Sequence, residues 1–206
     1  MTDDMAKKND TVSDLCMQDC IRRFDEARSD LVLAVAKGTM LRPLAESGLE
    51  MVECYRTDAE NFCKGGDYVT AFAAINYAHA WIGCFRSYGL FGPGPYEELF
   101  IKLDERDSDA SSAITDERMA KYLDITTRAR KKVKISPPVR SFDRKLALDF
   151  LEKSETYFKT AVDYRRDNDY LRAFAAVNYS HAWLDGAARI GLFDVEGDDV
   201  LFTLYE

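Results

Sequence analysis

One stretch of this chain occurs twice, and the duplication constrains the fold more than any other feature. The sequence AFAAINYAHAW at residues 71–81 returns as AFAAVNYSHAW at 173–183, with Ala71 and Ala173 separated by 102 positions. Both histidines and both tryptophans of the protein lie in these two segments. The same offset pairs Leu44 with Leu146 upstream and GLF at 89–91 with GLF at 191–193 downstream. A register held over this length indicates a tandem duplication.

The length of the repeat predicts how the chain divides into domains. A period of about 100 residues lets each copy bury its own core, unlike the short repeats of a solenoid. We therefore expect repeat units at residues 11–103 and 113–206, joined by an acidic, serine-rich linker at 104–112. Residues 1–10 are polar and charged and are expected to form a disordered tail.

Composition limits the classes of partner. The chain has 206 residues, of which 47% are hydrophobic, as in a globular protein. Its net charge of −8 is expected to repel nucleic acid and anionic membranes. The longest apolar run, at 31–36, is too short to cross a bilayer, and the N-terminal residues lack the apolar segment of a signal peptide. All five cysteines fall in the first copy, which argues against a shared disulfide framework and suits a reducing compartment. These features predict a cytoplasmic protein with no membrane partner.

Helical periodicity and capping residues predict three helices in each copy. The expected helices are 11–37, 43–64 and 68–88 in the first copy and 116–133, 142–166 and 170–190 in the second. Gly38 and Gly89 stand where helix C-caps belong, and Asp67 stands at an N-cap position. The third helix of each copy is apolar on nearly all sides, which is typical of a helix buried between neighbours.

We therefore predict an all-α protein built from two tandem three-helix up-and-down bundle units related by internal duplication. Each unit is expected to cover the apolar surface that the other leaves exposed. The apolar pairs at 99–100 and 201–202, which follow the third helices, are expected to fold back onto the bundle.

The second copy also resembles a known family. The segment DYLRAFAAVNYSHAWLDGAARIGLF at 169–193 resembles the archaeal domain family of unknown function DUF357, and LALDFLEKSETYF at 146–158 resembles the helix before it. The resemblance covers most of the second copy and, more loosely, the first. It implies an archaeal source and a small up-and-down bundle, and it implies no activity. The first copy has Gly83-Cys84 where the second has the family-like Asp185-Gly186, so a role for this carboxylate is expected only in the second copy.

The repeated polar residues of the third helix are the strongest candidates for a functional site. Asn and His three positions apart face the same side of a helix, and on an apolar helix they need hydrogen-bond partners. One hypothesis is a small pocket in which His acts as an acid, base or donor while Asn orients a ligand. The other is a buried structural network in which Asn and His bond backbone groups or the carboxylates of Glu53 and Glu155. The candidates are Asn76, Tyr77, His79 and Trp81 in the first copy and Asn178, Tyr179, His181, Trp183 and Asp185 in the second.

A run of cations stands out in this acidic chain. It contains Arg128, Arg130, Lys131, Lys132, Lys134 and Arg140. Such a run could bind nucleic acid or an acidic partner. A simpler explanation is that cations are favoured at the C-terminus of a helix, and a solvated loop follows. The first copy has no such run, and we do not expect nucleic acid to be the main partner.

No residue pattern points to catalysis. No Ser or Cys lies beside the His at matching positions in both copies, so we predict no catalytic residue, no metal site and no cofactor. The favoured hypothesis is a non-enzymatic helical interaction or scaffold protein, with an unidentified protein partner or a homo-oligomer both left open. The alternative is a ligand-binding protein or enzyme that uses the Asn/Tyr/His/Trp residues. A third hypothesis is association with nucleic acid through residues 128–145.

Overall fold

The computed structural model describes residues 8–103, 108 and 110–204, and these residues form six α-helices. The first copy contributes α1 (Asp14–Ser29), α2 (Arg42–Lys64) and α3 (Tyr68–Tyr88). The second copy contributes α4 (Asp116–Lys132), α5 (Phe142–Arg166) and α6 (Tyr170–Ile190). The structure confirms the prediction of an all-α protein made of duplicated helical units. None of the helices in the described part of the chain is long and apolar enough to span a membrane.

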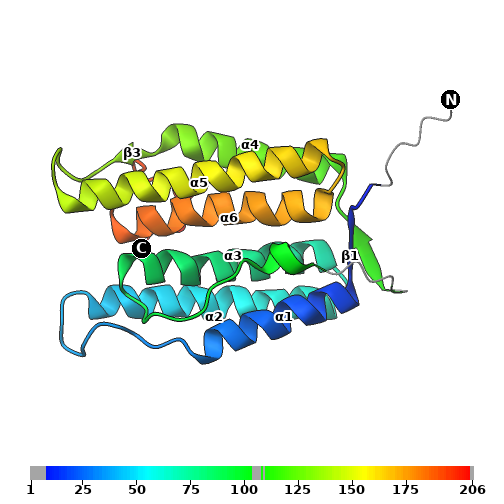
Figure 1. The fold of residues 1–206 in the computed structure, drawn as a ribbon, viewed down its shortest axis with the longest axis horizontal. Coiled ribbons are helices and arrows are strands. Elements are labelled where there is room, and N and C mark those ends of the chain that lie inside the picture. Colours follow the sequence, from blue (N-terminus) through cyan, green and yellow to red (C-terminus); the bar gives the residue numbers. More distant parts are fainter. Residues whose placement is uncertain (1–7, 104–107, 109, 205–206) are drawn as a thin grey trace.

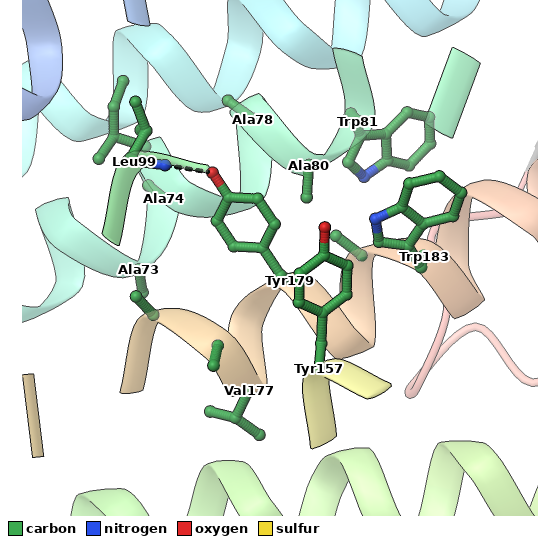
Figure 2. Packing of buried hydrophobic residues seen from close by; sticks show 14 of the residues in the cluster. Ala73, Ala74, Ala78, Ala80, Trp81, Leu99, Tyr157, Val177, Tyr179 and Trp183 are labelled. Carbon is green, nitrogen blue, oxygen red and sulfur yellow. Dashed lines mark hydrogen bonds between the residues drawn. The ribbon is translucent and has the colours of Figure 1, made fainter. Parts of the chain in front are cut away.

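The third helices of the two units lie side by side at the centre of the molecule (Figure 1). α1 and α2 cover α3 on one side, and α4 and α5 cover α6 on the other. α3 and α6 also pack on each other, so one connected hydrophobic core runs through both units. Many core positions on α3 are alanines, among them Ala73, Ala74, Ala78 and Ala80 (Figure 2). Their small side chains let the neighbouring helices approach closely.

The ends of the central helices follow from their capping residues. The Asp67 carboxylate accepts a hydrogen bond from the Thr70 backbone N–H, and Asp169 accepts one from Arg172 in the same way. Both helices end at a glycine in the left-handed conformation, Gly89 with φ 85° and Gly191 with φ 90°. Glycine adopts this conformation without a steric penalty, and both helices therefore end at these residues.

The first helix is shorter than predicted. α1 ends at Ser29 rather than at residue 37, and an extended segment follows it. The Ala34 N–H donates to the Leu90 carbonyl at 2.9 Å, and the Gly92 N–H donates to the Val32 carbonyl at 2.8 Å. Solvent exposure alternates along residues 31–36, as it does in a strand. The prediction was wrong because an apolar run can bury alternate residues against a neighbouring segment as readily as one side of a helix.

The second copy repeats this arrangement with two short strands. β3 (Lys134–Ile135) pairs with β4 (Phe193–Asp194). The isolated bridge between Leu33 and Phe91 is its counterpart in the first copy, since both partners lie 102 positions earlier. The duplication therefore extends to the extended segments beside the helices.

The N-terminal segment forms backbone hydrogen bonds with residues beyond the first unit. β1 (Thr11–Ser13) pairs antiparallel with β2 (Ser111–Ala113), which spans the end of the expected linker and the start of the second unit. The Asn9 N–H donates to the Asn168 carbonyl, and the Leu171 N–H donates to the Asn9 carbonyl, both at 2.9 Å. Residues 1–7 of the predicted tail and 104–107 and 109 of the predicted linker lie outside the described residues.

The segments that follow the third helices fold back onto the core, as predicted. Leu99 begins a short 3₁₀ helix, η1 (Leu99–Lys102), and both Leu99 and Phe100 are buried. Leu201 and Phe202 are buried at the matching place in the second unit. These two segments bring backbone groups close to the histidines of the repeat.

Candidate functional site

His79 is a core residue held by the other unit. Its Nδ1 lies 2.8 Å from the hydroxyl oxygen of Tyr179. The same hydroxyl accepts a hydrogen bond from the Leu99 backbone N–H at 3.0 Å, which Figure 2 shows. Because the Tyr179 hydroxyl accepts from Leu99, its own proton is free to be donated to His79. The His79 ring stacks on Tyr96 with centroids 4.7 Å apart.

Burial controls the protonation of this histidine. His79 is 1% exposed, and burial lowers its pKa to about 3, with the nearby positive charges of Arg23 and Arg86 acting in the same direction. His79 is therefore neutral at physiological pH. In the first copy, the motif histidine has the surroundings of a structural residue.

The repeated asparagines and tryptophans are also packed into the core. The side-chain amides of Asn76 and Asn178 donate to the carbonyls of Phe72 and Phe174, one helical turn earlier, each at 2.8 Å. Both Trp81 and Trp183 are buried against phenylalanine rings.

The carboxylates expected as partners are engaged elsewhere. Glu53 bonds Arg28, and Glu155 pairs with Arg130, so that detail of the buried-network hypothesis was wrong. The histidine partners are instead the Tyr179 hydroxyl and a backbone carbonyl.

Tyr77 breaks the symmetry between the two copies. It is the counterpart of Tyr179, yet its hydroxyl donates to Asp185 Oδ2 at 2.8 Å rather than to a histidine. The Thr203 N–H donates to the other carboxylate oxygen of Asp185. Burial raises the pKa of Asp185, and these hydrogen bonds oppose that rise. The first copy has Gly83 at this position, where a Cβ would lie 2.5 Å from the Tyr96 ring.

Because the Tyr77 hydroxyl donates to Asp185, the Nδ1 nitrogen of His181 does not receive the hydrogen bond that His79 receives. The Nε2 of His181 donates to the Leu201 carbonyl at 2.9 Å, which fixes the tautomer. Its Nδ1 is buried and has no hydrogen-bond partner among the described residues. Loss of solvation lowers the pKa of His181, so the ring is neutral and Nδ1 carries a lone pair. His79 and His181 occupy the same position in the repeat, but only His79 has its Nδ1 satisfied.

A pocket of about 390 Å³ lies beside His181, and we call it the inter-unit pocket. Its walls come from α2, α3, α4, α6 and the C-terminal segment 199–203. Asn178 and His181 of the motif line it. The aromatic residues of the lining are Tyr55, Phe62, Tyr77, Tyr122 and Phe202. The sequence pointed to Asn178, Tyr77 and His181, but the rest of the lining comes from segments that only the folded chain brings together.

The corresponding region of the first copy has a different lining. Thr126 and Tyr122 line the inter-unit pocket, and their counterparts are Phe24 and Cys20, both fully buried. The Phe24 ring centroid lies 6.4 Å from that of His79. A hollow of about 550 Å³ lies at the matching place beside His79, since its Arg23, Glu97 and Leu99 are the counterparts of Ile125, Asp199 and Leu201 in the inter-unit pocket. Its charged lining residues are Arg23, Glu26, Asp30 and Glu97. The two copies therefore place the same motif in different surroundings.

The cations of the basic run are largely paired. Arg130 pairs with Glu155 and lies over the Phe158 ring at 4.4 Å, while Arg128 approaches Asp124 at 3.9 Å. Lys132 and Lys134 both pair with Glu196. Lys131 and Arg140 are exposed, and Arg140 has a positive φ of 71° in the loop before α5. Because carboxylates neutralise the paired cations, this surface attracts phosphate groups less strongly than the sequence suggested.

Comparison with known proteins gives a family and no activity. Within residues 8–103, 108 and 110–204, no three His, Cys, Asp or Glu side chains are arranged to hold a metal ion. No curated protein and no solved structure matches the chain. The family described as "Protein of unknown function (DUF357)" matches residues 20–91 and again residues 121–193. The two matches cover α2, α3, α5 and α6 and much of α1 and α4. The chain belongs to the DUF357 family and carries the family's domain twice in tandem.

Proposed function

We propose that this protein binds a small organic molecule in the inter-unit pocket and that it is a binding protein rather than an enzyme. The volume of about 390 Å³ lies within the range of known small-ligand sites, about 300–1,000 Å³. The lining combines aromatic and aliphatic side chains with several polar groups, as in other small-ligand sites. Residues of both units form these walls, as is common for sites at domain interfaces.

The difference between the two copies is the observation that carries the proposal. A well-packed core gains stability when space is filled, and a cavity left open costs free energy that grows with its volume. At matching positions the first copy has the larger Phe24 for Thr126 and the charged Arg23 for Ile125, and its hollow beside His79 is lined by four charged side chains and one tyrosine. An open space lined by five aromatic side chains in one copy only is best explained by a bound ligand.

The histidine of the pocket supports binding more than catalysis. His181 donates to a backbone carbonyl and is neutral, and Asp185 is hydrogen bonded by Tyr77 and Thr203. Among the described residues the His181 ring has no hydroxyl or thiol as a hydrogen-bond partner, which activation of a nucleophile by a histidine base requires.

The experiment is a fragment screen by ligand-observed NMR on three proteins: the wild type, Thr126→Phe and Thr57→Phe. Thr126→Phe introduces the residue that the first copy has at the matching position, while Thr57 is an exposed residue of α2 outside the pocket lining. We expect fragments that bind the wild type to bind Thr126→Phe at least about tenfold more weakly and Thr57→Phe unchanged, because filling the cavity removes their contact area. A wild type that binds no fragment, or equal binding by Thr126→Phe, would contradict the proposal.

Self-association is a second candidate, and it rests on a separate observation. The loop before α2 and the start of α5 lie at the same end of the molecule (Figure 1), and both expose apolar side chains. Met40 is 96% exposed, and Phe142, at the matching position of the second copy, is 71% exposed. Exposed apolar patches often mark interfaces. Sedimentation of the wild type and of the double variant Met40→Asp, Phe142→Asp tests this candidate, which predicts a dimer only for the wild type.

A further inference from the structure

Resting on the proposed function, we infer that the ligand of the inter-unit pocket is an organic cation, an alkylammonium group carried on an apolar body. Three independent features of the pocket favour positive charge: the aromatic walls, the charges at the rim and the neutrality of the histidine. Each is considered in turn.

The aromatic residues provide the first argument. Five aromatic side chains from four segments line a space of about 390 Å³. Tyr55 and Tyr77 meet edge to face with their centroids 4.9 Å apart, so their rings enclose the space from different directions. The face of an aromatic ring attracts a cation within about 6 Å, and cages of such rings are a common way of binding ammonium groups.

The charges at the rim provide the second argument. Asp58 of α2 and Asp199 of the C-terminal segment are exposed carboxylates in the pocket lining. Lys121 of α4 is the opposing charge, also exposed. Two carboxylates against one ammonium leave the rim negative, and the net charge of −8 extends this field over the whole molecule. Such a field attracts cations toward the site.

The interior of the pocket adds no positive charge. His181 donates its only N–H to the Leu201 carbonyl, and its lowered pKa keeps the ring neutral. Asp185 is hydrogen bonded by Tyr77 and Thr203, which both belong to the lining, so its carboxyl group lies directly behind the wall. An anionic ligand would therefore find Lys121 as its one cationic partner in the lining, opposed by the carboxylates.

The test compares three probes of similar size and different charge: phenethylamine, 2-phenylethanol and 3-phenylpropionate. Their dissociation constants for the full chain are measured by calorimetry at low and moderate salt. We expect phenethylamine to bind at least about tenfold more tightly than the alcohol, with a preference that falls as salt screens the rim charges. The propionate is expected to bind most weakly.

Substitutions at the rim locate the effect. The double variant Asp58→Asn, Asp199→Asn is expected to weaken phenethylamine binding about five- to tenfold and to leave the alcohol unchanged. Lys121→Gln is expected to strengthen amine binding about twofold, since it removes a repulsive charge. Asp124→Asn is the control, because Asp124 is an exposed carboxylate of α4 outside the pocket lining.

The outcomes separate the ligand class from the proposed function. If the alcohol or the propionate binds as tightly as the amine, or if the rim variants change nothing, the cation assignment is overturned while the pocket remains a binding site. The same holds if other fragments bind the wild type and phenethylamine does not. If no fragment binds the wild type, the proposed function and this inference both fail.

Discussion

Two histidines at the same repeat position have different hydrogen-bond partners. The ring of His79 accepts from Tyr179 of the other unit, whereas the ring of His181 donates to a carbonyl of its own unit and leaves Nδ1 unpaired. The difference is caused by Asp185. Its carboxylate accepts the hydrogen bond of the Tyr77 hydroxyl, so this hydroxyl does not donate to His181. Gly83 holds the matching position in the first copy, so no side chain there competes for Tyr179.

The buried neutral state of His79 makes stability depend on pH. The pKa of His79 is about 3 in the folded protein and about 6.5 in the unfolded chain, so the unfolded state binds more protons between these values. The free energy of unfolding should therefore fall as the pH is lowered from 6.5 toward 3, by about 2 kcal/mol at pH 5 from this residue. His79→Gln removes the titrating group, and chemical denaturation at pH 7 and pH 5 should show a smaller loss for this variant.

Asp185 changes the pH dependence of the free energy of unfolding in the opposite direction. Its effect cancels when the wild type is compared with His79→Gln. The pKa of Asp185 is raised in the folded state, so the folded protein binds this proton more readily and gains stability as the pH falls. The wild type and His79→Gln both carry Asp185 and therefore share its contribution to the free energy of unfolding. An equal loss of stability in both proteins between pH 7 and pH 5 would show that His79 is not buried in its neutral form.

At the scale of the helices, local signals in the sequence were sufficient for most boundaries. Asp67 and Asp169 begin the third helices and glycines end them, because capping depends only on residues close in the chain. The end of α1 was missed because its cause is distant: residues 31–36 lie extended against residues 90–92, which follow α3. Contacts between distant segments leave no periodic signal in the sequence.

The close contact between α2 and α3 also could not be predicted from the sequence. Gly48 of α2 lies against the ring of Phe85, and a Cβ at Gly48 would come within 2.1 Å of that ring. Phe85 itself is fully buried and stacks between Trp81 and Phe91, so the ring has no space into which it can move.

Gly48→Ala should therefore destabilise the protein by about 1–3 kcal/mol through overpacking. Gly65→Ala is the matched control, because Gly65 has φ −80° and an added Cβ would meet its nearest atom at an ordinary 3.5 Å. Urea denaturation of both variants measures the difference. A Gly48→Ala protein as stable as Gly65→Ala would contradict the packing described for α2 and α3.

The whole molecule has one core rather than two. α3 and α6 pack together, Tyr179 and Tyr77 each bond a residue of the opposite unit, and β1 pairs with a strand that lies beyond the first unit. The duplication predicted two units that cover each other, and this followed from two helices that are apolar on nearly all sides. The inter-unit pocket could not be predicted, since it depends on which side chains fail to fill the space between the units.

A shared core predicts that the two units unfold together. Calorimetry of the full chain should show a single transition whose calorimetric and van't Hoff enthalpies agree. A fragment of residues 8–103 should lack dispersed amide signals in NMR, because α3 would expose the side that α6 covers. Two resolved transitions, or a fragment with native dispersion, would mean that each unit is stable by itself.

The central claim is that His79 belongs to the core and that His181 lines a ligand site. Its most direct test is to follow the imidazole signals of both histidines by NMR while phenethylamine is added, with His79→Gln providing the assignment. We predict that the His181 signals shift on binding, because an aromatic ligand in the pocket changes the ring-current field at its wall, and that the His79 signals stay in place. Shifts at His79 alone, or equal shifts at both rings, would contradict the account.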